Sequence, residues 1–231
     1  MRVLTWNLFH GQAVPDRPGP LLDDFAGHLA GWPWDVALLQ EVPPWWGPPL
    51  GSAAHASART ALTSRNWLLP LRRVVAERLP GLLGSWGGGA NVILVRPSAG
   101  RIAEHRTSTL RLLPERRVVH AVRLADGTWV ANVHCQGHGE ARAQADLARS
   151  ARTVKGWSGT APSVLGGDVN TFHPVTPPGF AHIGGHRVDH VFAHRFAPGH
   201  PRRPATTPSR GGLSDHAAVL VDLVRQDGRR R

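Results

Sequence analysis

The chain has 231 residues, 41% of them hydrophobic, which is enough for one sizeable domain with its own core. Its single cysteine, Cys135, excludes an intrachain disulfide, and no apolar run approaches the length of a membrane-spanning helix. The formal net charge of +11 indicates a polyanionic partner. Lys155 is the single lysine among 27 basic residues, however, and such an arginine bias also arises from genome base composition, so both explanations stay open.

The first half of the chain predicts two buried strands around a helix. Residues 2–9, RVLTWNLF, form a short β-rich run with no charged-then-apolar leader, and we therefore expect a cytoplasmic protein, monomeric by default. Residues 20–30 predict a helix, because apolar residues recur on one face behind an acidic first turn. DVALLQEV at 35–42 predicts a second strand, and the proline-rich residues 43–49 a rigid loop. Irregular segments with some strand are expected over 51–85.

The second half of the chain predicts more strands than helices. The alternating runs 116–124 and 128–135 flank Asp126–Gly127, a pattern typical of a hairpin with a tight turn. Residues 139–157 predict a helix with an alanine-lined face. Further strands are expected at 91–96, 163–170, 186–194 and 216–223, with a loop over 197–213. These elements predict a mixed α/β sandwich that forms one domain over residues 1–225, followed by a basic, disordered tail at 226–231.

Six of the predicted strands carry a hydrogen-bonding or ionisable residue at one end. These residues are Asn7, Glu41, His134, Asp168 with Asn170, Asp189, and the segment Ser214–Asp215–His216 before the last strand. Asp168 and Asn170 are two residues apart, so on an extended chain they share one face. Active sites are commonly built where strands stop and loops begin, and we expect these side chains to line one pocket.

The residue types in this set restrict the chemistry of the pocket. Asparagine and carboxylate ligands without cysteine favour a hard divalent cation, most plausibly Mg²⁺ or Mn²⁺. Two histidines beside the carboxylates allow one group to take a proton and another to stabilise developing negative charge. No serine or cysteine nucleophile with an adjacent base is evident in the sequence, which favours attack by activated water over a covalent intermediate.

The motifs TWN, LLQEV, NVH, GDVN, RVDHVF and SDH resemble, in order and spacing, those of the endonuclease/exonuclease/phosphatase superfamily, from residue 2 to about residue 224. Each motif is weak alone, whereas the ordered set of six is specific. The resemblance implies a four-layer α/β sandwich of two packed mixed sheets flanked by helices, as in DNase I-like enzymes. It also implies a metal-dependent hydrolase of phosphoester bonds.

On the metal side of the site, the resemblance implies that Glu41 is the principal ligand. Asn7 would help to hold the metal or the phosphate, and Asp215 would lie beside the metal. The chain departs from one branch of the superfamily, because it contains no tyrosine to contact the phosphate. Arg116 or Arg117, at the start of a predicted strand, would supply a cation there instead.

On the phosphate side, the resemblance implies that Asp168 orients or deprotonates the attacking water. Asn170 and His134 would bind the scissile phosphate. His216, oriented by Asp189, would act as the acid/base or stabilise the pentavalent transition state.

Three functions are compatible with these residues. The first is a nuclease that acts on DNA or RNA, which the basic charge favours. The second is the same chemistry on a phospholipid head group or a small phosphoester. The third is a non-catalytic, basic nucleic-acid-binding module, and the complete set of site residues argues against it.

Two further patterns have alternative interpretations. Four histidines recur every fourth residue, as a zinc-binding row on a helix would require: His182, His186, His190 and His194. Gly184–Gly185 interrupts such a helix, and the alternation around Asp189 indicates a strand, so the zinc row is disfavoured. Trp45–Trp46 and Trp86 fit substrate contacts and ordinary packing equally well.

Overall fold

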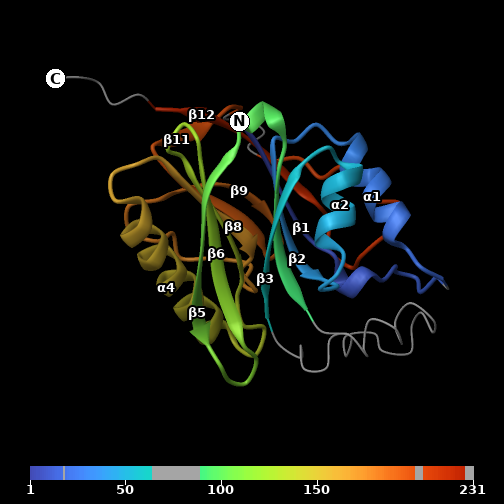
Figure 1. The fold of residues 1–231 in the computed structure, drawn as a ribbon. Helices are drawn as coiled ribbons and strands as arrows, with labels where there is room; N and C mark the ends of the chain where they lie inside the picture. Colours follow the sequence, from blue (N-terminus) through green and yellow to red (C-terminus); the bar gives the residue numbers. More distant parts are fainter. Residues whose placement is uncertain (18, 64–88, 201–204, 227–231) are drawn as a thin grey trace.

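Two six-stranded sheets packed face to face form the centre of the molecule (Figure 1). The computed structural model describes residues 1–17, 19–63, 89–200 and 205–226. The first sheet has the strand order β11-β12-β1-β2-β4-β3. Its strands are β1 (Arg2–Asn7), β2 (Val36–Val42), β3 (Ser57–Leu62), β4 (Ala90–Val95), β11 (Phe196–Pro198) and β12 (Val219–Arg225).

The second sheet has the strand order β5-β6-β7-β8-β10-β9. Its strands are β5 (Ile102–Arg111), β6 (Arg117–Leu124), β7 (Trp129–His134), β8 (Ser163–Asp168), β9 (Ala181–His186) and β10 (Asp189–His194). β6 and β7 form the hairpin that the alternating pattern predicts, and β7 pairs in parallel with β8. Both sheets are therefore mixed, as the sequence indicates.

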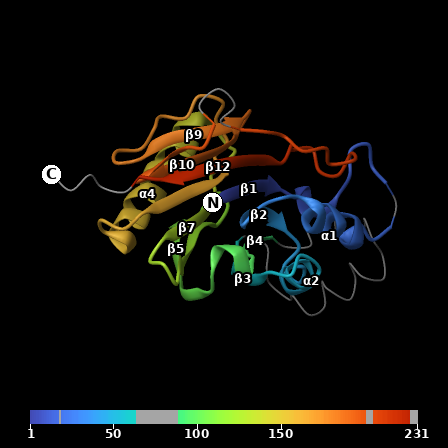
Figure 2. The ribbon, with the colours of Figure 1, turned by 90° about the horizontal axis from the view of Figure 1, so that it is seen from above.

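Helices cover the outer face of each sheet (Figures 1 and 2). α1 (Leu22–Gly31) and α2 (Gly47–Ala53) lie on the first sheet, α4 (Glu140–Ser158) lies on the second, and two short 3-10 turns are η1 (Phe9–Gly11) and η3 (Pro97–Ala99). Three apolar clusters fill the spaces between the layers, one under α1 and α2, one between the sheets and one under α4. The predicted four-layer α/β sandwich is confirmed. Within the described residues, no helix is both long and apolar enough to cross a membrane.

The proline-rich segment after β2 differs from the prediction. Residues 43–49 were expected to be a rigid loop throughout, yet α2 begins at Gly47 and contains two prolines in its first turn. The first turn of a helix needs no backbone N–H donors, so proline fits there without loss of a hydrogen bond. Leu50, on the inner face of α2, is buried in the apolar cluster between this helix and the first sheet.

Two other predictions differ from the structure, and two fall on residues that the structure does not describe. The single strand expected at 186–194 is the second half of a hairpin, in which Arg187 turns between β9 and β10 at a φ of 55°. β5, the edge strand of the second sheet, was not anticipated, because its residues are mostly polar and give little hydrophobic signal. Trp86 and residues 227–231 of the basic tail lie outside the described residues.

A buried polar network joins the facing sides of the two sheets. Gln40 Nε2 on β2 donates a hydrogen bond to Asn132 Oδ1 on β7 over 2.8 Å. Asn132 Nδ2 in turn donates to the carbonyl oxygens of Leu39 (2.9 Å) and Val92 (3.0 Å) in the first sheet. A shifted packing of the sheets would leave these fully buried amides without partners, which costs more than the hydrogen bonds contribute. The network therefore fixes how the two sheets face each other.

His120 on β6 gives this interior a pH dependence. Its side chain is fully buried between the sheets, and burial together with the nearby charge of His105 lowers its pKa from 6.5 to about 3. Between pH 6.5 and pH 3, this imidazole is protonated in the unfolded chain and neutral in the folded protein. The contribution of neutral His120 to the free energy of unfolding is therefore fully present above pH 6.5 and is lost as the pH falls towards 3. His120→Leu should remove this loss, so that between pH 7.5 and pH 5 its free energy of unfolding falls by about 2 kcal/mol less than that of the wild type.

Urea unfolding at pH 7.5 and pH 5 measures this effect. His200→Leu is the matched control, since the His200 side chain is 75% exposed and should leave the acid dependence as it is in the wild type. Parallel pH profiles for the wild type and His120→Leu would contradict the assignment.

Candidate active site

Parallel strands bring one half of the site together in each sheet. β1 and β2 are parallel, so Asn7 at the end of β1 lies beside Gln40 and close to Glu41 at the end of β2. β7 and β8 are also parallel, with His134 directly opposite Asp168. Asn7 Nδ2 donates a hydrogen bond to Asp168 Oδ2 over 2.9 Å, which joins the two strand ends across the sandwich. The predicted rim is therefore a junction between both sheets.

The sharp turn after β8 places Asn170 differently from the prediction. The backbone N–H of Asn170 donates to Asp168 Oδ1 (3.0 Å), and Asn170 has a φ of 53°. The strand therefore ends at Asp168, and the two side chains are related by an Asx turn rather than by strand alternation. Asn170 Nδ2 donates to the carbonyl oxygen of Cys135 (2.9 Å), which ties this turn to the end of β7.

Gly167 allows β8 to approach β7 this closely. A Cβ atom at this position would lie 1.8 Å from the carbonyl oxygen of Val133. Gly167 also has a φ of +145°, which residues with a side chain rarely adopt. Only glycine fits such an approach without moving the backbone. The close contact keeps the carboxylate of Asp168 beside the imidazole of His134, whose Nε2 lies 3.5 Å from Asp168 Oδ2.

The first residue of β10 orients the histidine that precedes β12. Asp189 lies opposite Asp168 in the β8–β10 pairing, and its Oδ2 accepts a hydrogen bond from His216 Nδ1 over 2.8 Å. His216 Nε2 then faces Asp168 Oδ2 at 3.8 Å. The interaction that the sequence predicts between Asp189 and His216 is thus present, and it leaves Nε2 directed into the site.

Buried hydrogen bonds hold the loop that carries His216 against β1. Ser214 Oγ donates to the carbonyl oxygen of Asn7 (2.6 Å) and accepts from the backbone N–H of His216 (3.0 Å). Trp6 Nε1 donates to the carbonyl oxygen of His216 over 3.2 Å. Ser214 is fully buried at a φ of 62°, a strained conformation for a residue with a side chain. Trp6, a fully buried core residue, therefore also supports the site.

The charges of this group are strongly coupled. Burial and the neighbouring Asp189 raise the pKa of Asp168 to about 7, against the opposing effect of His216. Burial also raises the pKa of Asp189. Burial opposes protonation of His216, but the hydrogen bond and charge of Asp189, with the charge of Asp168, outweigh it and raise its pKa to about 9. Two buried carboxylates whose pKa values are both raised form a site that is short of positive charge.

Glu41 is directed into the same space by a bulge in β2. The pairing of β2 with β4 shifts between Leu39 and Val42, and Glu41 has a φ of 50°. Its Oε1 lies 3.8 Å from His134 Nε2, and its Oε2 lies 3.1 Å from His10 Nε2. His10 was not identified from the sequence. The available signal was a histidine three residues after Asn7, in the short turn that continues β1.

Arg117 contacts the other side of His134. Arg117 Nη1 donates a hydrogen bond to His134 Nδ1 (2.8 Å), and Arg117 Nη2 lies 2.5 Å from Glu115 Oε2. Burial, followed by the positive charge of Arg117, lowers the pKa of His134 well below 6.5. Of the two arginines considered as a source of positive charge, Arg117 therefore reaches the site, whereas Arg116 Nη1 donates to the carbonyl oxygen of Leu62.

The donor atoms at the site fit a divalent cation. Ligand atoms of Asp168, Asp189 and His216 all lie within 4.8 Å of one another, the closest such group in the described residues. Asp189 Oδ1 is buried and has no hydrogen-bond partner within these parts of the chain. Two carboxylates and one imidazole are a donor set for Mg²⁺, Mn²⁺ or another divalent ion of the first transition row.

The three residues expected as metal ligands are arranged around this group. Asn7 uses both side-chain atoms in hydrogen bonds, to Asp168 and from the backbone N–H of Phe9. Glu41 Oε1 and Asp168 Oδ2 both approach His134 Nε2, at 3.8 Å and 3.5 Å. Asp215 is 45% exposed, with its Oδ1 3.9 Å from His216 Nε2. The carboxylates thus surround a common space, and their division between metal and substrate stays a prediction.

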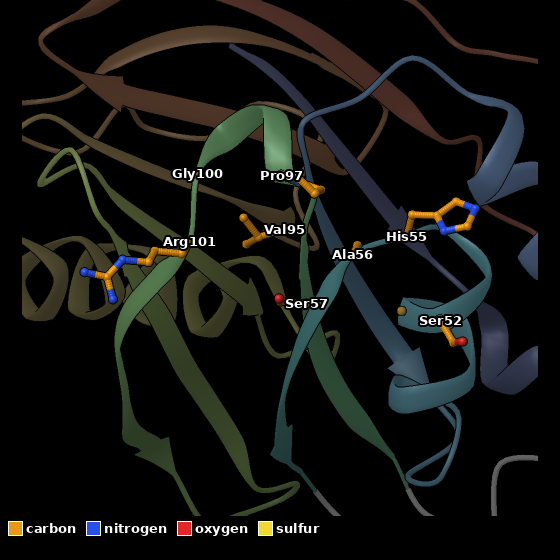
Figure 3. A pocket seen from close by; sticks show the side chains of 9 residues that line it. Ser52, His55, Ala56, Ser57, Val95, Pro97, Gly100 and Arg101 are labelled. Atoms are coloured by element: carbon orange, nitrogen blue, oxygen red, sulfur yellow. The ribbon is translucent and has the colours of Figure 1, made fainter.

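Two other features lie away from this chemistry. Trp46 is buried against Phe25, and Trp45 packs on the same cluster, so this pair belongs to the core. A pocket of about 420 Å³ opens where β4 ends (Figure 3). The end of β4 lies beside the start of β2, so the pocket is at the end of the sandwich opposite Glu41. The side chains of His55 and Arg101 extend to opposite sides of this pocket and do not converge on one ligand. The four histidines of the disfavoured zinc row lie on the β9–β10 hairpin, as the alternation predicts.

The sandwich and its rim of carboxylates, amides and histidines define the class of DNase I-like phosphoesterases. The model of the Endonuclease/Exonuclease/phosphatase family matches residues 4–216, and the chain belongs to this family. Its members hydrolyse phosphoester bonds and generally use a divalent metal ion. No curated protein gives a significant match to the sequence.

Solved structures with the same fold include proteins of different activity. An endonuclease/exonuclease/phosphatase from Beutenbergia cavernae DSM 12333 is 22% identical, with a TM-score of 0.70 over 98% of this chain and 72% of that one. A mannosyl-6-phosphatase from Bacteroides thetaiotaomicron VPI-5482 is 15% identical, with a TM-score of 0.65 over 97% of this chain and 99% of its own. Humanized D. rerio TDP2 is 15% identical, with a TM-score of 0.64 over 97% and 98%. At these identities the likeness establishes the fold alone.

Proposed function

We propose that this protein is a Mg²⁺- or Mn²⁺-dependent phosphodiesterase that cleaves nucleic acid by attack of an activated water molecule. One observation carries the proposal: both sheets direct their polar strand ends into one space, where Asp168 faces His134 on one side and His216 on the other. Buried carboxylates and imidazoles that converge with no nucleophilic serine or cysteine beside them in the described residues are suited to hydrolysis of a phosphate ester.

The residues divide into three roles. Asp168 accepts a proton from, or orients, the attacking water, and its raised pKa suits a base near neutral pH. His134 and Asn170 bind the oxygens of the scissile phosphate. His216, held by Asp189, stabilises the transition state or protonates the leaving oxygen through Nε2. A metal ion held by Glu41, Asn7 and Asp215, or by the neighbouring group that contains His216, would neutralise charge on the phosphate.

Two observations favour nucleic acid as the substrate. The net charge of +11 attracts a polyanion to the whole protein. In addition, Phe172 follows Asn170 by two residues and is 57% exposed, with the guanidinium of Arg187 5.7 Å from its ring. An exposed aromatic ring beside an arginine is a suitable surface for stacking a base next to its phosphate.

A substrate panel in the presence of Mg²⁺ or Mn²⁺ tests the proposal. Plasmid, single-stranded DNA, abasic DNA and RNA are compared with a phospholipid and with bis(p-nitrophenyl) phosphate, each with and without chelator. We expect cleavage of nucleic acid that the chelator abolishes. Preferred cleavage of the phospholipid or of a small phosphoester would keep the chemistry and replace the substrate. Binding of nucleic acid without cleavage of any phosphoester would favour the non-catalytic module.

Phe172→Ala should separate recognition of nucleic acid from the chemistry. Loss of one stacking contact costs about 1–3 kcal/mol per base, so KM for a single-stranded oligonucleotide should rise roughly tenfold or more. The kcat for bis(p-nitrophenyl) phosphate should stay the same, since this small substrate carries no flanking nucleotide for Phe172 to stack. Steady-state kinetics on both substrates measure the difference. Val175→Ala, which truncates a second exposed apolar residue after β8, is the control. An equal effect of Phe172→Ala on both substrates would contradict the stacking role.

A further inference from the structure

The guanidinium of Arg117 lies directly behind the imidazole of His134. Arg117 is the first residue of β6 and is only 8% exposed, although it carries a charge. Its Nη1 is 2.8 Å from His134 Nδ1, and its Nη2 lies beside the carboxylate of Glu115. The salt bridge orients the guanidinium, because one edge is held by Glu115 while Nη1 faces the ring of His134. A buried arginine in this position needs an explanation beyond packing.

The identity of the donor determines the state of the ring. A guanidinium has five N–H groups and no acceptor, and it stays protonated in proteins. His134 Nδ1 must therefore be the acceptor, which requires a lone pair on that nitrogen. An imidazolium has no such lone pair, so His134 is neutral, and its single ring proton is on Nε2.

The protonated nitrogen faces the proposed phosphate site. His134 Nε2 lies 3.5 Å from Asp168 Oδ2 and 3.8 Å from Glu41 Oε1, between the two carboxylates. In this tautomer His134 presents an N–H donor to an anionic phosphate oxygen. In the other tautomer it would present a lone pair, which repels that oxygen. The orientation of one proton thus decides whether His134 attracts or repels the substrate.

We propose that Arg117 is a positioning residue that fixes His134 as a neutral imidazole protonated on Nε2, so that its N–H is directed at the scissile phosphate. The identity of the anion rests on the proposed function. The state of the ring does not, because it follows from the contact between Arg117 and His134 alone. Glu115 supports this arrangement by holding the far side of the guanidinium.

Nitrogen-15 NMR of the histidine rings tests the proposal in the metal-free protein and without any turnover. Long-range ¹H–¹⁵N spectra distinguish a protonated ring nitrogen from one with a lone pair. In the wild type we expect one acceptor-type signal for Nδ1 of His134 and one protonated signal for Nε2. Arg117→Met should shift both towards averaged values, since no donor then selects the tautomer. Arg117→Lys, which also donates and cannot accept, should restore the wild-type pattern.

Kinetics provide the second measurement. Loss of a partner that orients a site histidine typically costs about 10- to 100-fold, so Arg117→Met should lower kcat by this amount with KM changed less than about threefold, and Arg117→Lys should recover part of the loss. Arg123→Met is the matched control, since Arg123 lies on the same strand, pairs with Glu104 at the surface and should leave spectra and kinetics unchanged.

Specific outcomes would overturn the proposal. A wild-type spectrum with the proton on Nδ1, or with both nitrogens protonated at neutral pH, contradicts it directly. So does an Arg117→Met variant with the wild-type spectrum and kcat. If Arg117→Met does not fold, the wild-type spectrum still decides the state of the ring, and Arg117→Lys decides whether a donor is sufficient. An inactive wild type with the expected spectrum would refute the proposed function and leave the role of Arg117 intact.

Discussion

Asp189→Ala and His216→Ala are each expected to lower kcat by about 10³-fold, and the double variant should lower it little further. The reason is the 2.8 Å hydrogen bond from His216 Nδ1 to Asp189 Oδ2. Without Asp189, the ring of His216 loses both its orientation and the charge that raises its pKa to about 9. Without His216, Asp189 has no catalytic group to orient. Each single change therefore removes the function of the pair.

Single-turnover rates of the four proteins, wild type included, measure this coupling in a double-mutant cycle. His186→Ala is the control, because His186 lies opposite Asp189 in the β9–β10 pairing but is exposed. It should retain nearly full activity. Losses that add, giving a double variant about 10⁶-fold slower than the wild type, would show that the two residues act independently.

Glu41→Gln should abolish metal-dependent activity, by about 10³-fold or more, and mimic the effect of a chelator. The substitution keeps the shape of the side chain and removes its negative charge, which attracts the cation. Because the contacts of Glu41 within the described residues are with the imidazoles of His10 and His134 and not with an arginine, loss of its charge should leave the melting temperature nearly unchanged.

Calorimetric titration with Mn²⁺ and the rate of substrate cleavage measure the two effects separately. Affinity for Mn²⁺ and kcat should fall together in Glu41→Gln. Glu104→Gln is the control, since Glu104 forms surface ion pairs with Arg106 and Arg123 and should preserve both quantities. Activity that resists chelators in the wild type would refute the metal-dependent mechanism, and normal Mn²⁺ affinity in Glu41→Gln would exclude Glu41 as the principal ligand.

The fold was predictable where hydrophobic periodicity was strong. The alternating residues of β6 and β7 and the apolar face of α4 identified these elements directly. The short helix α2 was missed, because two prolines in sequence indicate a loop unless they fall in a first turn, and a sequence does not show where that turn begins. β5 was missed because an edge strand with one weakly buried face lacks the apolar pattern.

For the site, the sequence indicated the residues at strand ends. It did not indicate the contacts made by residues in irregular turns or on neighbouring strands. Ordered motifs located Asp168, Asp189 and His216, whose contacts follow from strand ends. The contact of His10 with Glu41 depends on an irregular turn and a bulge, and neither has a clear sequence signal. Arg117 was noticed as a cation, yet its role depends on the single nitrogen that it contacts across the β6–β7 hairpin, which requires atomic geometry.

The assembly of the site from both sheets has a consequence for synthesis of the chain. Asn7 is made early, Asp168 and Asp189 later, and His216 only just before β12, which pairs with β1. A ribosome that has translated the chain as far as residue 215 therefore carries a nascent chain that lacks His216 and β12. For an enzyme of the proposed kind, catalysis would begin only once translation has passed β12 and this strand has paired with β1, so RNA beside the ribosome meets no assembled site before that point.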